Sequence, residues 1–275
     1  MIPQREAFFI EAGTGKRFCL VTRPARPPLG ALLYIPPFAE EQNKSRRTAA
    51  LAAQAFAKQG WLILQLDLFG CGDSSGDFAD ANWSDWLEDL SLGWQWLQTY
   101  SQGPCALWSL RAGSLLAADW LAGQTITPPW LMWQPVTNGR QHLAQFLRLK
   151  TANAMLAETG VQNAAQSLRD TIQAGHPIEV AGYTVTPDLF NGLEAATLRL
   201  PAAYPAPVIV LEVSPPERQN LSPALGTQLK KWQDDQITTL AEVVSGPSFW
   251  QTVEIEEAPE LVKRSASLLG NFVHV

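Results

Sequence analysis

The residues best suited to chemistry form one short segment, Ser109-Leu110-Arg111-Ala112-Gly113, between an apolar strand and a helix start rich in small residues. This layout is typical of a nucleophile elbow, a sharp strand-to-helix turn that usually has the sequence G-x-S-x-G. Here Ser109 replaces the first glycine and Arg111 occupies the tip. A guanidinium stays protonated at any working pH and cannot attack a carbonyl. The segment therefore predicts an elbow without its usual nucleophile.

Two serines flank the tip. Side chains alternate by two along a strand, so the Ser109 hydroxyl could lie on the same face as Arg111, and Ser109 is the weak candidate for a nucleophile. The simpler interpretation is that Ser109 only replaces a small glycine. Ser114 is expected to pack the following helix against the sheet.

Strands alternate with helices along most of the chain, which predicts a mostly parallel sheet with helices on both faces. Continuous apolar runs are typical of strands buried on both faces. Two strands at residues 7–12 and 17–23 predict an antiparallel start. The other expected strands are 31–35, 61–67, 105–108, 130–133, 205–213 and 237–244, and the expected helices are 44–58, 82–100, the segment from the elbow to about 121, 218–233 and 258–269.

The alternation stops between about residues 138 and 200. This stretch has mainly helical spacing, apart from a non-helical piece at 178–187. We interpret it as a lid inserted over the strand ends. The predicted organisation is a core formed by 1–137 and 201–275, with a lid formed by 138–200.

Glycines are dense after the strand that ends at Asp67, which predicts positive φ angles or close backbone approach. The nearby carboxylates (Asp67, Asp73, Asp77 and Asp80) fit such a turn better than a calcium loop. The sequence has no H-E-x-x-H motif and no His/Cys cluster, so neither a metal nor another cofactor is predicted.

The composition limits the class of protein. Of 275 residues, 46% are hydrophobic and 17% charged, and the net charge of −6 argues against a general nucleic-acid binder. Three widely spaced cysteines favour a reducing compartment. No signal-type segment and no run of about 20 apolar residues is found, so a cytoplasmic protein without a membrane span is expected. The 11 tryptophans either fill the core or line a ligand pocket.

Several segments together resemble the α/β-hydrolase superfamily. Asp67 to Ser74 is similar to its D-x-x-G-x-G-x-S turn, and the elbow, the insertion and the two late strands follow in the expected order. A narrower resemblance is to the exosortase A system-associated hydrolase of the second type, which also carries arginine at the elbow tip. The segments that carry it are 35–44, 108–113, 145–150, 180–183 and 249–250.

The resemblance implies an exosortase-linked exopolysaccharide system and a small-molecule, saccharide or acyl ligand, with a partner protein of the export system as a further expectation. In the superfamily a histidine follows the last strand, but this loop contains Ser248 and Trp250 and no histidine. The histidines are His142 and His176 in the presumed lid and His274 near the C-terminus. A lid histidine can reach a site, but ordinary surface positions are expected.

The resemblance also implies hydrogen-bond donors for an oxyanion at the backbone of Phe38, Ala39 and Ala112. The helix N-terminus and Arg111 add positive charge there. We therefore predict a pocket for a carboxylate, phosphate or acyl-phosphate group. Further expected lining residues are Glu40, Glu41, Glu212, Ser248 and Trp250.

The alternative is that Glu40 or Glu41 neutralises Arg111 in a buried ion pair that mainly fixes a loop. Two hypotheses of function follow. The first is a hydrolase of an ester, thioester or acylated saccharide that lacks the usual Ser-His-acid triad. The second is a non-catalytic relative that binds an anionic ligand or a partner protein through the Arg111 pocket.

Overall fold

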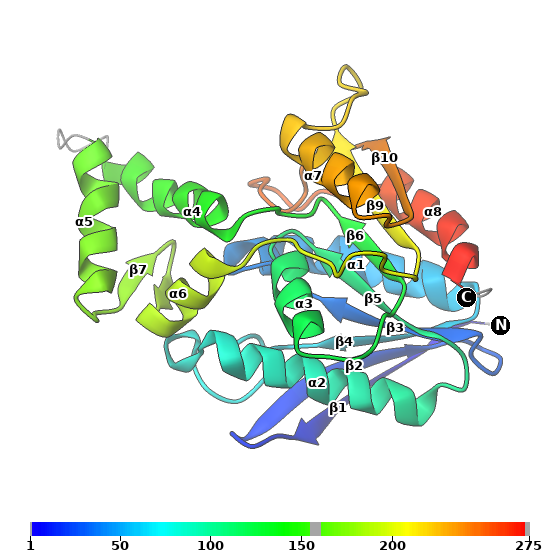
Figure 1. The fold of residues 1–275 in the computed structure, drawn as a ribbon. Helices are drawn as coiled ribbons and strands as arrows, with labels where there is room; N and C mark the ends of the chain where they lie inside the picture. Colours follow the sequence, from blue (N-terminus) through cyan, green and yellow to red (C-terminus); the bar gives the residue numbers. More distant parts are fainter. Residues whose placement is uncertain (1, 155–160, 273–275) are drawn as a thin grey trace.

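The computed structural model describes residues 2–154 and 161–272, and an eight-stranded sheet forms its centre. The strands lie in the order β1-β2-β4-β3-β5-β6-β9-β10 (Figure 1). β1 and β2 pair antiparallel with each other and β2 with β4, while all other neighbours in this sheet are parallel, as predicted. The strands are Gln4–Glu11 (β1), Lys16–Arg23 (β2), Gly30–Ile35 (β3), Trp61–Leu66 (β4), Cys105–Leu110 (β5), Trp130–Trp133 (β6), Val208–Ser214 (β9) and Thr239–Ser245 (β10).

Helices cover both faces of the sheet. Side chains of α1 and α8 share one buried apolar cluster, and side chains of α2, α3 and α7 share the other. Five tryptophans are among the largest fully buried side chains, which supports the core-filling interpretation for them. No helix in the described part of the chain combines the length and apolar character needed to cross a membrane. The helices are Glu40–Lys58 (α1), Trp83–Tyr100 (α2), Gly113–Ala122 (α3), Pro223–Asp234 (α7) and Pro259–Leu268 (α8), with 3-10 turns at Phe78–Asp80 (η1) and Leu269–Phe272 (η3).

One helix starts earlier than the sequence suggested, and this matters for the site. α1 begins at Glu40 rather than near residue 44, directly after Ala39. Glu40 and Glu41 therefore lie in its first turn, where a carboxylate interacts favourably with the helix N-terminus. The two carboxylates are positioned by a helix rather than by a loop.

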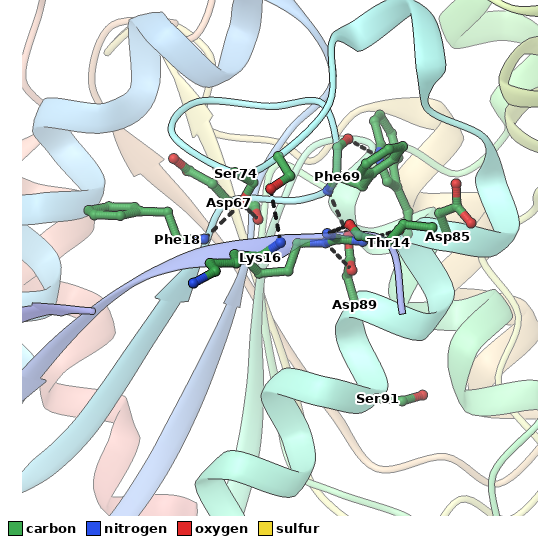
Figure 2. A network of polar contacts seen from close by, with 12 residues as sticks. Thr14, Lys16, Phe18, Asp67, Phe69, Ser74, Asp85, Asp89 and Ser91 are labelled. Atoms are coloured by element: carbon green, nitrogen blue, oxygen red, sulfur yellow. Dashed lines mark hydrogen bonds and ion pairs between the residues drawn. The ribbon is translucent and has the colours of Figure 1, made fainter. Parts of the chain in front are cut away.

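The glycine-rich turn after β4 is tied to the N-terminal hairpin (Figure 2). The Ser74 hydroxyl donates to the Asp67 carbonyl at 2.5 Å and accepts from the Phe18 amide at 2.9 Å. Gly72 has a φ of 57°, and a Cβ there would lie 1.9 Å from the Asp67 carboxylate. The dense glycines thus have the backbone reason that the sequence predicted.

A buried ion pair completes this attachment. Figure 2 shows Asp89 reaching from α2 toward the backbone of Phe69, whose amide donates to it at 2.7 Å. Arg17 Nε donates to the other Asp89 oxygen at 2.5 Å, and Arg17 also donates to the Thr14 carbonyl at 2.7 Å. The pair joins β2, the turn and α2.

The segment between β6 and β9 packs beside the starts of α1 and α2 (Figure 1). Its base carries an isolated antiparallel bridge between Asn138 and Thr197. The Asn43 amide donates to the Tyr183 hydroxyl at 3.0 Å, so the insertion touches α1 close to the elbow side of the sheet. Its elements are Gly139–Ala154 (α4), Val161–Gln173 (α5), Ile178–Val180 (β7), Tyr183–Val185 (β8) and Pro187–Ala195 (α6).

Candidate functional site

The predicted elbow is present between β5 and α3. Arg111 at its tip has a φ of 53°, in the left-handed region that costs a non-glycine residue about 1–2 kcal/mol. The turn is held from both sides: the Arg111 amide donates to the Trp133 carbonyl at 3.0 Å, and the Arg111 carbonyl accepts from Ser114 at 3.0 Å. Such strain persists only where the surroundings fix it, and it is common at functional sites.

The Arg111 side chain makes an ion pair with Glu41. Its Nε donates to Glu41 Oε1 at 3.1 Å, and Nη2 lies 3.0 Å from the same oxygen. The guanidinium carbon lies 5.4 Å from the centre of the Trp250 ring, within the range of a cation–π contact. Nη1 has no hydrogen-bond partner among the described residues. One edge of the guanidinium is therefore occupied by protein and the other is not.

A cavity of about 110 Å³ lies beside this ion pair. It brings together residues of α1, the elbow, α4 and the loop after β10. Leu149, which is 41% exposed, marks its outer side. The lining residues are Phe38, Glu40, Glu41, Arg111, His142, Gln145, Phe146, Leu149 and Gln251.

The ionisable groups of the cavity are strongly affected by burial. Burial raises the pKa of Glu41 to about 7, although the Arg111 charge acts to lower it. Burial also raises the pKa of Glu40. Both carboxylates have one buried oxygen, Oε2, without a hydrogen-bond partner among the described residues. Near neutral pH the cavity therefore contains a carboxyl group that can change its protonation state.

The expectation that His142 lies at the surface is wrong. His142 is 5% exposed rather than a surface histidine, because the apolar face of α4 turns it toward Phe38, whose ring centre lies 6.1 Å from its own. Burial, and then the Arg111 charge, lower the pKa of His142 to about 3, so the imidazole is neutral at pH 7. Neither ring nitrogen has a hydrogen-bond partner in the part of the chain that the structure describes. His142 lies one position before Leu143 on the buried side of α4, the only sequence signal for this placement.

His176 does not line the cavity. His176 is exposed, as expected, and His274 lies outside the described residues. The loop after β10 supplies Trp250 and Gln251 instead of a histidine.

Ser109 is buried and its hydroxyl is engaged on the inner side of the elbow. Its Oγ lies 2.8 Å from the Ser114 hydroxyl and accepts from Trp130 Nε1 at 2.9 Å. Ser109 has no exposed surface and does not line the Arg111 cavity. Both serines thus join the elbow strand, its helix and β6, which fits the packing role that the sequence suggested.

The predicted donors lie close to the elbow but enclose little space. Phe38 and Ala112 line a crevice of about 10 Å³, the volume of a single water at most. Ala39 is buried beside it, with a φ of 52°, as the residue that precedes α1. The Arg111 cavity therefore lies next to the backbone donors, on the side of Arg111 and His142.

Glu212 and Ser248 lie apart from the cavity lining. The Glu212 carboxylate accepts from Arg218 at 2.7 Å and from the Ser222 amide at 2.9 Å, so its partners come from the segment that follows β9. The Ser248 carbonyl accepts from Gln251 at 2.9 Å. Four of the predicted pocket residues line the cavity: Phe38, Glu40, Glu41 and Arg111. Trp250 contacts the Arg111 guanidinium beside it.

The described fold is similar to solved structures with which the chain shares little sequence. Est1E from Butyrivibrio proteoclasticus, with ferulic acid bound, is 12% identical over 98% of this chain and 100% of its own, with a TM-score of 0.66. A highly thermostable carboxyl esterase from Bacillus coagulans, in complex with glycerol, is 14% identical over 99% of both chains, with a TM-score of 0.65. The alpha/beta hydrolase GrgF from Penicillium sp. sh18 is 14% identical over 99% of this chain and 100% of its own, with a TM-score of 0.60.

No protein-family model matches the sequence, and no curated protein matches it. The structural similarities establish the α/β-hydrolase fold, with a mostly parallel central sheet and helices around it. Fold alone does not establish chemistry, so the function is argued from the site.

Proposed function

We propose that this α/β-hydrolase-fold protein binds a small anionic group, a carboxylate or a phosphate, in the Arg111 cavity. The group belongs to a saccharide or acyl ligand of an exosortase-linked exopolysaccharide system, the context that the sequence resemblance suggests. In this proposal the protein acts in the cytoplasm, and residues 138–200 form the lid that closes over the ligand. A partner protein of the export system is the alternative occupant.

The observation that carries the proposal is the half-occupied guanidinium of Arg111. Arginine recognises carboxylates and phosphates through a planar fork of N–H donors. Nη1 has no partner among the described residues, while Glu41 and Trp250 hold the rest of the group in place. A donor fixed in this way, beside a cavity of about 110 Å³, supports binding of a compact anion.

The environment of Ser109 argues against an acyl-enzyme mechanism. A serine nucleophile needs a base within hydrogen-bond reach, about 2.6–3.2 Å. The partners of the Ser109 hydroxyl are Ser114 and the indole of Trp130, and neither is a base. We expect a fluorophosphonate probe to leave Ser109 unlabelled under conditions that label a control serine hydrolase. A label mapped to Ser109 and lost in Ser109→Ala would contradict the proposal.

Calorimetric titration with acetate at pH 6 tests anion binding directly. We expect millimolar affinity for acetate and none for acetamide, its neutral analogue. Because removing Arg111 alone leaves Glu41 unpaired, the test variant is the double replacement Arg111→Met with Glu41→Gln. It is expected to weaken acetate binding at least tenfold, while Arg47→Met, an exposed arginine of α1, leaves binding unchanged. Equal binding in the double variant would refute the proposal.

A second candidate function is hydrolysis by an activated water. It is favoured by Glu41, whose pKa of about 7 suits a general base and whose Oε2 has no partner among the residues described. Arg111 would then stabilise the developing oxyanion. The substrate would be an ester, thioester or acylated saccharide. This function predicts that the protein hydrolyses p-nitrophenyl acetate. Treatment with the fluorophosphonate probe is expected to leave this activity unchanged, and Glu41→Gln is expected to abolish it.

A further inference from the structure

When Glu40 and Glu41 are both ionised, the charges around the Arg111 cavity cancel without a ligand. Glu40 and Glu41 carry two negative charges when ionised, and Arg111 and Lys44 carry two positive charges. Lys44 is not one of the lining residues, but its Nζ donates to the carbonyl of the lining residue Gln251 at 3.4 Å, and its charge acts on Glu41. His142 is buried and adds no charge at neutral pH. An entering anion would therefore leave this site with one negative charge in excess.

The contact between Arg111 and Glu41 leaves hydrogen-bonding atoms of both side chains unused. Glu41 uses only Oε1 for Arg111, and its buried Oε2 has no hydrogen-bond partner within residues 2–154 and 161–272. A buried carboxylate oxygen without a partner is unfavourable as part of an anion, but it can carry a proton. The Arg111 contact thus leaves one oxygen of Glu41 available to carry a proton.

We propose that the cavity takes up its anion together with one proton, which binds the Glu41 carboxyl as the ligand replaces Glu41 on Arg111. This inference rests on the proposed function. The proton comes from solvent and the only bond formed is the O–H bond on Glu41, so the charge of the site is the same before and after binding.

The surroundings of Glu41 support this exchange. It is faced by Glu40 and Lys44 on α1, by Arg111 at the elbow and by His142 on α4, and the loop after β10 contributes only uncharged side chains there. Burial already raises the pKa of Glu41 to about 7 while Arg111 lowers it. Loss of the Arg111 contact to a ligand would raise this pKa further.

The experiment is acetate titration calorimetry at constant ionic strength between pH 6 and pH 9, where acetate stays a monoanion. Two cationic buffers with different ionisation enthalpies report the protons taken up. Below pH 7 we expect a Kd that levels off, and above pH 7 a Kd that rises about tenfold per pH unit, with close to one proton bound per acetate at pH 8.

Two variants locate the proton. Glu41→Gln is expected to bind acetate with a Kd independent of pH and without proton uptake. Glu40→Gln, the neighbouring carboxylate, is the matched control and is expected to keep the slope.

Acetate binding by the unmodified protein with no pH slope and no proton uptake would overturn the inference and leave the proposed function standing. A slope that disappears in Glu40→Gln but persists in Glu41→Gln would also overturn it. Absence of acetate binding at every pH would instead refute the proposed function.

Discussion

Arg111 and Glu41 show how one substitution at an elbow changes what a fold can do. The turn, its strained tip and the helix behind it are kept, but the tip carries a fixed cation in place of a nucleophile. The cation requires a counter-ion, and the first turn of α1 supplies Glu41. The ion pair that the sequence offered as an alternative is therefore present, but it occupies only one edge of the guanidinium.

His142 leads to a prediction about acid stability. Its folded-state pKa of about 3 lies below its ordinary value of 6.5, so the unfolded state takes up a proton first as the pH falls. Stability from this group is present above pH 6.5 and is lost progressively toward pH 3. The unmodified protein loses this contribution as the pH falls from 7 to 5, and His142→Phe does not. The difference in free energy of unfolding between the two proteins is therefore expected to shift by about 2 kcal/mol in favour of His142→Phe over this range.

Urea unfolding of both proteins at pH 7 and pH 5 measures this difference. Buried carboxyls with raised pKa values, such as Glu41, act in the opposite direction, but they are common to both proteins and cancel in the comparison. A stability difference that does not change with pH would show that His142 titrates normally in the folded state.

At the scale of elements, the elbow depends on the close approach of α3 to the end of β3. A Cβ on Gly113 would lie 2.5 Å from the Pro36 carbonyl oxygen and 2.6 Å from that of Ile35. Both are backbone atoms, so the contact can be relieved only if two elements move apart. The last glycine of the elbow is thus a requirement of packing.

Gly113→Ala is therefore expected to destabilise the protein by about 1–3 kcal/mol. Gly226→Ala on α7 is the matched control, because a Cβ there has no described atom within 4 Å. That change is expected to be neutral or to stabilise by up to about 1 kcal/mol, since alanine favours helix over glycine. Urea midpoints of the two variants provide the test, and equal midpoints would contradict this account of the elbow.

At the scale of the whole molecule, the N-terminal hairpin is joined to the parallel core by polar contacts as well as by β2–β4 pairing (Figure 2). Arg17 and Asp89 are 72 residues apart in sequence and only 3% and 2% exposed. A buried charge that loses its partner is strongly destabilising, while removal of both charges costs less.

Asp89→Leu is expected to cost about 3–5 kcal/mol, and the double variant Arg17→Met with Asp89→Leu to cost less than Asp89→Leu alone. The reason is that the single variant leaves the Arg17 guanidinium buried without its counter-ion. Urea unfolding of Asp89→Leu, of Arg17→Met and of the double variant measures the coupling between the two side chains. Additive losses would mean that the two side chains do not interact in the folded state.

The sequence by itself determined the alternation of strands and helices, the antiparallel start and the elbow, because each is encoded in local periodicity and in glycines with backbone requirements. It also determined that the tip is an arginine and that the loop after β10 has no histidine. Local patterns could not reveal the start of α1 at Glu40, since the acidic pair suits a loop or a first helical turn equally.

Only the tertiary structure decided which polar groups meet. Arg111 pairs with Glu41, which is 70 residues away in the sequence. Glu212 binds Arg218 and does not line the cavity. The tertiary structure also buried His142 beside Arg111 and satisfied the Ser109 hydroxyl inside the elbow. These outcomes depend on how helices and loops pack across the sheet, and periodicity shows which face of an element is buried but not which distant side chain it faces.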